Sequence, residues 1–353
     1  MLNSILNNNP NVLVVGSGWA AKSFSSNIDK NKYNVTMISS ETTFLYTPLL
    51  ANFSVTKNIK NIDKDMSKCK DIKFINETVS DVDFKNQLLF TSKNNYKYDY
   101  IVFAHGSTIN TFNIDGVKEH CLFLKSKNDA ENIYKKLQTL HNDATVAVIG
   151  CGLTGSELIG SLIDCKRFNL IAIDALKTPL TMFARNNIDF TLDIWKKNNV
   201  KMYFNHFVKK VDDVDIYFKN NKQKYDLAIW CGGVKINPLS MLINKKIQLS
   251  SNKGILVDKY LKILNCHNAF AIGDCADSGE LLTAQNANQQ GLYLANRFNN
   301  YFNENKEYAY SNKGKLCYIG NQNSIYESRL FSLSGKAGFY FGKLVHFINR
   351  NFN

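Results

Sequence analysis

The sequence predicts an α/β protein in which helices cover two parallel sheets. Three observations support this fold class: a strand–turn–helix–strand pattern near the N-terminus, the same pattern again near the middle of the chain, and further buried strands that end in glycine turns. Each strand–turn–helix–strand pattern is the sequence signature of a βαβ unit.

The first pattern begins with the apolar strand Val12–Val15. The turn Gly16-Ser17-Gly18-Trp19-Ala20-Ala21 follows, then a helix to about Asp29 and a second strand at Tyr33–Ser39. In such a turn the first glycine permits the tight bend, the second lets a pyrophosphate approach the backbone, and a small third residue allows close helix–sheet packing. The helix N-terminus supplies free N–H groups for the phosphates. We therefore predict a dinucleotide site that includes Gly16, Gly18, Trp19 and Ala21.

The second pattern repeats the first one in architecture. Thr145–Ile149 is the strand, Gly150-Cys151-Gly152-Leu153-Thr154-Gly155 is the turn, Ser156–Cys165 is the helix and Leu170–Asp174 is the next strand. This turn is a complete G-x-G-x-x-G, so Gly150, Gly152 and Gly155 are predicted nucleotide contacts. An acid in the position of Asp174 hydrogen-bonds an adenosine 2′-hydroxyl and repels a 2′-phosphate, which favours NADH over NADPH.

Three more strands end in glycine. They are Tyr96–Ala104 before Gly106, the run from Tyr225 before Gly233, and the strand from Ala269 that reaches Gly273 and Asp274. A carboxylate at a strand tip beyond the two βαβ units can bond the ribityl hydroxyls of a flavin. We therefore assign FAD to the first unit and NADH to the second, in two Rossmann-like dinucleotide-binding domains.

Composition restricts the partners. The chain has 353 residues and a formal charge of +13, from 43 basic and 30 acidic residues. Such an excess ordinarily indicates nucleic acid or an anionic membrane. Only five of the basic residues are arginine, however, and the lysines are scattered along an asparagine-rich chain. Nucleic-acid binding would rest on charge alone, and we predict no nucleic-acid partner.

The cysteines and the N-terminus indicate an intracellular protein. None of the eight cysteines forms a C-x-x-C pair or clusters with histidine at zinc-ligand spacing, so we expect reduced thiols and no metal site. Met1–Pro10 carries neither a basic residue nor an apolar core, so no cleavable presequence is visible. No run of 18 apolar residues is present to span a membrane.

These residues resemble the type II NADH:quinone oxidoreductases, also called alternative NADH dehydrogenases, over nearly the whole chain. Thr43-Phe44-Leu45-Tyr46-Thr47-Pro48-Leu49-Leu50 resembles the family's F-T-P-L-L segment beside the flavin, which implies that Thr47 and Pro48 contact the cofactor. Asn110–Val117 is similar to its N-T-F-x-I-x-G-V. Gly155-Ser156-Glu157 matches its G-x-E, whose glutamate lies near the nicotinamide. The family often lacks an acid after its second strand, where this chain has Ser39-Ser40.

The segment Ala284-Gln285-Asn286-Ala287-Asn288-Gln289-Gln290-Gly291 is similar to the family's A-Q-x-A-x-Q-x-G, which lines the quinone pocket. The resemblance implies that Ala284 contacts the cofactor and that Gln285 and Gln289 approach the flavin and the quinone head. Some members carry histidine at the position of Asn288. Asparagine can donate a hydrogen bond but cannot relay a proton as histidine does.

The last helix is predicted to begin near Gly335. One apolar stripe on it contains Ala337, Tyr340, Phe341, Leu344, Val345 and Ile348, and basic side chains recur on another face at Lys336, Lys343 and Arg350. The last 48 residues hold seven Lys or Arg against two Glu. Such a helix can lie in an anionic membrane interface. The alternatives are a helix that covers the flavin domain and a homodimer seam.

Four segments follow from these patterns: residues 9–123 as the first part of an FAD-binding domain, 124–245 as an inserted NADH-binding domain, 246–310 as the second FAD part with the quinone-site segment, and 311–353 as a short C-terminal region with the amphipathic helix. The predicted activity is transfer of electrons from NADH through FAD to a membrane quinone without proton pumping, in a peripheral membrane protein, with the mitochondrial inner membrane as one location.

Two other activities share this fold. A sulfide:quinone oxidoreductase needs cysteines that flank the flavin and has little use for an NADH site, and a redox-signalling protein like apoptosis-inducing factor needs no quinone pocket. The intact second glycine turn with Asp174 disfavours the first, and the Gln285–Gln289 segment disfavours the second. A disulfide reductase needs a closely spaced cysteine pair, which this chain lacks; its nearest pair is Cys266 and Cys275.

Overall fold

The fold was analysed in a computed structural model that describes residues 9–58, 62–69, 72–303 and 305–351. The N-terminal segment expected to hold no presequence lies almost wholly outside the described residues. The chain forms two compact units, which are described separately. The first contains Met1–Leu45, Asp63–Thr108 and Lys235–Ser311, and the second contains Tyr46–Ile62, Ile109–Val234 and Asn312–Asn353. The four predicted domain boundaries stay predictions.

The first unit is built on a five-stranded parallel sheet. Its strands follow the order β21-β9-β1-β2-β5, with β1 in the centre. Their bounds are β1 Asn11–Val15, β2 Asn34–Ser39, β5 Lys73–Asn76, β9 Tyr100–Phe103 and β21 Ala269–Ala271. Val12–Val15 is at most 4% exposed, as expected for a strand buried on both faces of a parallel sheet.

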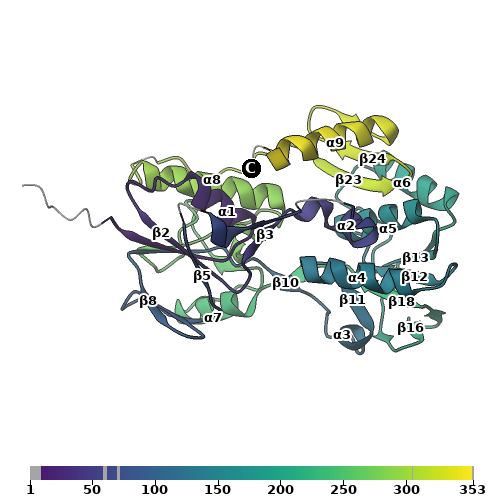
Figure 1. The fold of residues 1–353 in the computed structure, drawn as a ribbon, viewed down its shortest axis with the longest axis horizontal. Coiled ribbons are helices and arrows are strands. Elements are labelled where there is room, and N and C mark those ends of the chain that lie inside the picture. Colours follow the sequence, from purple (N-terminus) through teal and green to yellow (C-terminus); the bar gives the residue numbers. More distant parts are fainter. Residues whose placement is uncertain (1–8, 59–61, 70–71, 304, 352–353) are drawn as a thin grey trace, which may run out of the picture. The chain divides into compact units, whose positions relative to one another are not determined.

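Two helices of the first unit lie side by side: α1 (Trp19–Asn27) and α8 (Ala284–Asn299) (Figure 1). A Cβ on Gly291 of α8 would lie 2.5 Å from the carbonyl oxygen of Ala20 in α1, so a glycine is needed for this close approach. The rings of Phe24 and Phe298 meet edge to face between the helices, with centroids 5.2 Å apart. The packing holds the start of α8 against the first glycine turn.

The remaining elements of the first unit are short. They are β3 Thr43–Leu45, β4 Asp63–Asp65, η2 Met66–Lys68, β6 Val79–Asp83, β7 Leu88–Thr91, β8 Asn95–Lys97, α7 Pro238–Lys246, β20 Ile255–Leu256, η3 Gly273–Cys275 and β22 Ala276–Asp277. The strands β6, β7 and β8 form an antiparallel sheet. The short strands β10 (Thr108–Ile109) and β19 (Val234–Lys235) stand where the chain passes from one unit to the other.

The second unit repeats the plan of the first with a parallel sheet in the order β11-β18-β12-β13-β14. Its strands are β11 Cys121–Phe123, β12 Thr145–Ile149, β13 Asn169–Asp174, β14 Lys201–Phe204 and β18 Leu227–Trp230. Together the two sheets confirm the predicted fold class, two doubly wound Rossmann-like units in one chain.

The other elements of the second unit surround this sheet and carry the chain to its C-terminus. They are η1 Thr47–Leu49, α2 Leu50–Thr56, α3 Val117–His120, α4 Lys127–Thr139, α5 Leu153–Cys165, α6 Arg185–Lys197, β15 Lys210–Val211, β16 Asp215–Tyr217, β17 Lys222–Lys224, β23 Lys315–Gly320, β24 Asn323–Glu327, β25 Ser332–Leu333 and α9 Gly335–Asn351. Helix α2 packs on α4 and α5, β23 packs on α5, and α9 packs on β24 (Figure 1).

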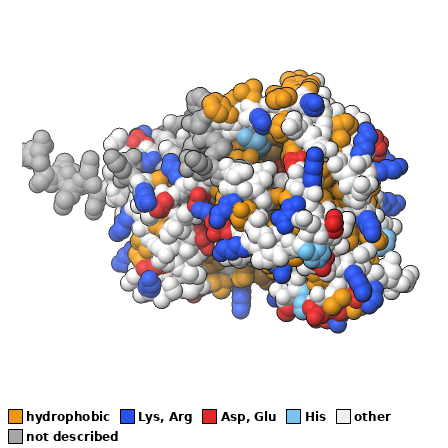
Figure 2. Space-filling view, turned by 45° about the vertical axis from the view of Figure 1, so that its right-hand side comes forward, with side chains coloured by type: hydrophobic (Ala, Val, Ile, Leu, Met, Phe, Trp, Pro, Cys, Tyr) orange, Lys and Arg blue, Asp and Glu red, His pale blue; other side chains and the backbone are white. Residues whose placement is uncertain are grey.

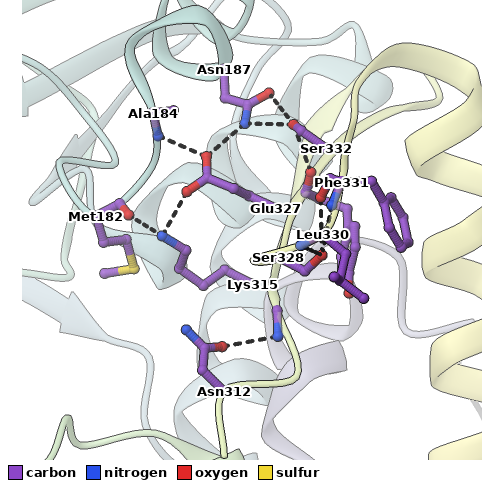
Figure 3. A network of polar contacts seen from close by, with 12 residues as sticks. Met182, Ala184, Asn187, Asn312, Lys315, Glu327, Ser328, Leu330, Phe331 and Ser332 are labelled. Atoms are coloured by element: carbon purple, nitrogen blue, oxygen red, sulfur yellow. Dashed lines mark hydrogen bonds and ion pairs between the residues drawn. The ribbon is translucent and has the colours of Figure 1, made fainter.

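Polar contacts fasten the β23–β24 hairpin to the loop before α6 (Figure 3). The Glu327 carboxylate accepts hydrogen bonds from the backbone N–H of Ala184 at 2.7 Å and from Asn187 Nδ2 at 2.9 Å. It also pairs with Lys315 Nζ at 2.9 Å, and Lys315 donates to the carbonyl oxygen of Met182. This network fixes the hairpin on which α9 rests.

The predicted elements differ from the observed ones at their ends. The predicted strand Tyr96–Ala104 is two strands, β8 and β9, because the chain turns at Tyr98-Asp99 and the Asp99 carboxylate accepts from the N–H of Asn11 at 2.7 Å. Helix α5 begins three residues before the predicted Ser156, directly after Gly152. The first helix ends at Asn27, two residues before the predicted Asp29.

The side chains of the apolar stripe predicted on α9 differ in their exposure to solvent. Phe341 and Val345 are half-buried, whereas Tyr340 is 62% and Leu344 54% exposed. The side of α9 that packs most closely is marked by Gly338 instead, where a Cβ would lie 2.3 Å from the Ser324 carbonyl oxygen. The predicted apolar stripe therefore leaves much of its surface uncovered.

Candidate functional site

The two glycine turns have the same geometry at their first glycine. Gly16 has φ +115°, and a Cβ there would lie 2.4 Å from the carbonyl oxygen of Ala104, at the end of β9. Gly150 has φ +97°, and a Cβ there would lie 2.5 Å from the carbonyl oxygen of Cys231, at the end of β18. In each unit this close approach lets the chain leave the central strand and enter the helix beneath it.

The second glycine of each turn faces open space. No heavy atom lies within 4 Å of the position that a Cβ would occupy on Gly18 or Gly152. Both glycines are the N-cap residues of their helices, and neither helix has a side-chain cap. Helix N–H groups without a side-chain cap, next to a glycine that leaves room for a ligand, are the arrangement that binds a pyrophosphate. The predicted contacts Gly16, Gly18, Gly150 and Gly152 thus come together in pairs at two helix N-termini.

The third positions of the turns pack inward. Ala21 is fully buried, and a Cβ on Gly155 would lie 1.8 Å from the carbonyl oxygen of Gly150. Gly106 and Gly233 follow the strands β9 and β18, each with a positive φ and with no heavy atom within 4 Å of a Cβ position. They occupy corresponding places in the two units.

The ends of the second strands distinguish the two turns chemically. In the second unit Asp174 Oδ2 accepts from the N–H of Cys151 at 2.6 Å and Oδ1 accepts from the N–H of Leu176 at 2.8 Å. In the first unit the corresponding place holds Ser39, whose hydroxyl donates to that of Ser17 at 3.2 Å. A carboxylate is therefore fixed beside the second glycine turn and a neutral hydroxyl beside the first.

The strand tip at Gly273-Asp274 is bonded by a residue of α8 and by a residue of the loop that follows β9. The N–H of Gly273 donates to Gln290 Oε1 at 2.6 Å, and the Ser107 hydroxyl donates to Asp274 Oδ2 at 3.0 Å. Gln290 is fully buried. In the same unit Trp19 packs edge to face on Phe44, with ring centroids 5.0 Å apart. Sequence reasoning missed Gln290 and Ser107, because nothing in the pattern separates Gln290 from its neighbours Gln285 and Gln289.

Polar side chains near the start of α8 make hydrogen bonds to Tyr310 and Ser311, in the segment C-terminal to this helix. Tyr310 Oη donates to Gln285 Oε1 at 2.9 Å. The Gln289 amide makes two bonds to Ser311: its Nε2 donates to the carbonyl oxygen at 2.9 Å and its Oε1 accepts from the N–H at 3.0 Å. Gln289 therefore has a positioning role in this structure, and the predicted approach of Gln285 and Gln289 to a quinone stays a prediction.

The second unit contains a cavity of about 300 Å³. Its wall is formed by the Pro48-Leu49 segment, the helices α2, α5 and α9, and the β23–β24 hairpin. Polar side chains in the wall include Glu157 and Asp164 from α5, Tyr318 from β23, and Lys343 and His346 from α9. Two predicted site residues, Pro48 and Glu157, thus line one cavity, with Thr47 next to Pro48 in the chain.

Burial raises the pKa of Glu157 to about 8, although a hydrogen bond from the backbone of Tyr318 favours the ionised form. At neutral pH this carboxyl is therefore mostly protonated and can donate a hydrogen bond or a proton into the cavity. Sequence reasoning missed His346, Tyr318 and Asp164. The helical spacing of His346 gave no signal, because it falls between the apolar stripe and the basic face.

The described residues fit the predicted cofactors. Each turn leaves uncapped helix N–H groups, an open approach over its second glycine and a strand tip with a polar side chain. Among the residues that the structure describes there is no cluster of His, Cys, Asp and Glu that could hold a metal ion. The eight cysteines, all of them among the described residues, are free.

Gly152→Ala should test the second turn without disturbing the fold. The residue has φ −70° and an empty Cβ position, so alanine adds no strain and we expect an unchanged melting temperature. The new methyl group would occupy the approach of the pyrophosphate, so NADH affinity should fall at least about tenfold, roughly 1.4 kcal/mol. Isothermal titration and thermal melting measure the two effects. Gly150→Ala is the contrasting variant, because it should lower the melting temperature; unchanged NADH affinity in Gly152→Ala would contradict the site.

Glu157 should make the protein less stable as pH rises. Its pKa is about 8 in the folded chain and near its ordinary value of 4.5 when unfolded, so the folded state binds more protons between these values. The free energy of unfolding should therefore fall as pH increases from about 5 to 8. Glu157→Gln should flatten this slope in urea titrations at several pH values. Glu119→Gln, which changes an exposed glutamate of α3, is the control and should keep it.

Comparison with known proteins finds relatives that align with nearly the whole chain. The chain is 27% identical to a probable mitochondrial NADH-ubiquinone oxidoreductase of Schizosaccharomyces pombe, over 95% of this chain and 78% of that protein. It is 29% identical to a probable NADH dehydrogenase of Dictyostelium discoideum, over 94% and 83%. It is 28% identical to an external mitochondrial NADH-ubiquinone oxidoreductase of Saccharomyces cerevisiae, over 95% and 76%.

Solved structures have the same fold. The structure of NDH2 from Plasmodium falciparum in complex with NADH superposes with a TM-score of 0.88, at 24% identity, and covers 96% of this chain and 94% of that one. The sulfide:quinone oxidoreductase of Aquifex aeolicus gives 0.83 at 18% identity, over 98% and 92%. At these identities the likeness concerns the fold alone.

A sequence profile decides the family. The profile of the pyridine nucleotide-disulphide oxidoreductases matches residues 10–291, which contain both glycine turns and the start of α8. The resemblance found in the sequence is therefore confirmed at this level, and the chain belongs to the pyridine nucleotide-disulphide oxidoreductase family.

Proposed function

We propose that this protein is a type II NADH:quinone oxidoreductase, which oxidises NADH and reduces a quinone without pumping protons. The overall reaction is NADH + H⁺ + quinone → NAD⁺ + quinol. The observation that carries the proposal is the pair of parallel sheets, each with an uncapped, open glycine turn at the start of its helix. The relatives named NADH-ubiquinone oxidoreductase support it, because they align over nearly the whole chain.

The two turns take different nucleotides. FAD belongs to the first unit, where Ser107 holds Asp274 at the strand tip. NADH belongs to the second unit, where Asp174 lies beside the turn and would repel a 2′-phosphate. When bound, the flavin accepts a hydride and passes two electrons on, and the chain contributes binding, orientation and electrostatics.

The quinone head group occupies the cavity of the second unit. Its wall contains Pro48, from the segment that resembles the family's flavin-side motif, and Glu157, from the motif that resembles its nicotinamide-side glutamate. A volume of about 300 Å³ is at the lower end for a small-molecule site. The wall combines apolar side chains such as Leu316 and Phe339 with a few polar groups, as a quinone ring and its carbonyl oxygens require.

The exposed side of α9 binds an anionic membrane surface. Tyr340, Leu344, Phe347 and Ile348 are each at least 44% exposed, and Leu330 in the preceding turn is 90% exposed. In Figure 2 hydrophobic side chains gather at the top of the view, where α9 and that turn lie. The exposed cations Arg329, Lys336 and Lys343 come from the same segment. Aromatic and aliphatic groups with neighbouring cations suit a lipid interface.

Among the described residues no helix is long and apolar enough to cross a bilayer. The relatives from Schizosaccharomyces pombe and Saccharomyces cerevisiae are named as mitochondrial proteins. We place this protein on the surface of the mitochondrial inner membrane, where quinone is dissolved in the lipid.

The electron route is tested by anaerobic stopped-flow spectroscopy of the purified protein. NADH should bleach the flavin absorbance, and a short-chain ubiquinone added next should restore it within the same time range. Bleaching without reoxidation by quinone would contradict the proposed function and favour a redox-signalling protein. Bleaching by sulfide and not by NADH would favour a sulfide:quinone oxidoreductase.

Membrane binding is tested by sedimentation with vesicles. The protein should pellet with vesicles that contain anionic lipid, and less so as salt rises, because surface charge attraction is screened. The double variant Leu344→Ser with Phe347→Ser should lose most of this binding and keep its melting temperature, since both side chains are exposed. The paired control Leu176→Ser with Phe207→Ser changes exposed apolar groups elsewhere in the unit. Equal binding by both variants would refute the assignment, and loss of a dimer instead would identify a homodimer seam.

A further inference from the structure

Reduction of a quinone needs a proton that the electron donor does not supply. The hydride of NADH carries two electrons and one proton, whereas quinol formation takes up two electrons and two protons. The second proton comes from water, and a side chain that gains and loses protons near neutral pH can pass it to the quinone. Asn288 stands where some members of the resembling family have histidine, and its amide cannot relay a proton as an imidazole does.

The cavity of the second unit contains an imidazole. His346 belongs to α9, lines the cavity and is half-buried, so it is partly accessible to solvent. Its Nδ1 lies 3.2 Å from the hydroxyl oxygen of Tyr46. Tyr46 is 5% exposed, and the two rings meet edge to face at 83° with centroids 6.1 Å apart. The tyrosine therefore fixes both the orientation of the imidazole and the hydrogen bond of one ring nitrogen.

We propose that His346, oriented by Tyr46, is the group that delivers the solvent proton to the quinone in this cavity. This inference rests on the proposed function and names the proton donor of its second half-reaction. The quinone oxygen gains the proton as the quinone is reduced. His346 gives up this proton from its imidazolium form, becomes a neutral imidazole, and then recovers a proton from water. Tyr46 is a positioning residue, because its hydroxyl is engaged by the imidazole.

The surroundings of His346 suit a proton exchanged in both directions. Among the described residues, the titratable and charged groups that line its cavity are Glu157 and Asp164 on α5, Tyr318 on β23 and Lys343 on its own helix, and Tyr46 before η1 bonds to it. Burial raises the pKa of Glu157 to about 8, so at neutral pH this carboxyl is mostly uncharged. It therefore does not form an ion pair that would hold the proton on His346. Glu157 can also donate to the second quinone oxygen. Imidazole is the side chain that ordinarily exchanges protons in this pH range.

The test uses the purified full chain with bound flavin in stopped-flow experiments with two acceptors. Quinone needs protons on reduction, whereas ferricyanide takes single electrons and no proton. In His346→Gln the bleaching by NADH and the reoxidation by ferricyanide should stay within about twofold of the parent protein, and reoxidation by quinone should slow at least tenfold. Tyr46→Phe should give a smaller loss with quinone, about threefold. The matched controls are His141→Gln and Tyr301→Phe, which change exposed residues.

Chemical rescue separates proton delivery from mere support of the fold. In His346→Ala, free imidazole in the buffer should restore quinone-driven reoxidation in proportion to its concentration, and should not affect the ferricyanide reaction. Unchanged quinone reoxidation in His346→Gln would overturn the inference, and so would equal slowing with both acceptors or a failure of rescue in a variant that keeps its flavin and melting temperature. A parent protein that quinone does not reoxidise would instead overturn the proposed function.

Discussion

The close approach of a glycine to the end of the neighbouring strand is the constraint on which both units depend. A Cβ at Gly16 or Gly150 would lie within 2.5 Å of a carbonyl oxygen, that of Ala104 or Cys231, so no other residue permits the central strand to turn at that point. The turn directs the helix so that its first N–H groups remain without a side-chain cap. These N–H groups can donate hydrogen bonds to a bound anion such as a pyrophosphate. The same backbone constraint therefore determines the fold and produces the nucleotide site.

What differs between the units is the chemistry around this common frame. A carboxylate, Asp174, contacts the second turn, and a pair of hydroxyls, Ser17 and Ser39, occupies the corresponding place in the first. In the first unit the strand tip at Gly273 is fixed by a buried glutamine from α8. Helix α8 in turn packs on α1 through Gly291. One helix thus couples the first glycine turn to the strand tip expected to hold the flavin's ribityl chain.

Sequence patterns were sufficient to predict the two βαβ units because their signals are local: an apolar run, a glycine spacing and a helix within about 30 residues. They also predicted α9 from Gly335. They could not predict the cavity of the second unit, which collects Pro48, Glu157, Tyr318 and His346 from segments far apart in the sequence. Nor could they distinguish Gln290, which holds Gly273, from Gln289, which holds Ser311, because both roles depend on tertiary partners.

In the proposed function, the cavity has to meet two requirements of a quinone reductase at one place. A lipid-soluble substrate has to enter from an apolar surface, and its reduced form has to gain protons from water. Helix α9 contributes to both, since it exposes Tyr340, Leu344 and Phe347 on one side and lines the cavity with His346 on another. Its close fit on the β23–β24 hairpin at Gly338 fixes the rotation of the helix, and so decides which residues face each environment. A larger residue at this glycine would therefore disturb the surface and the cavity together, although Gly338 is buried and does not line the cavity.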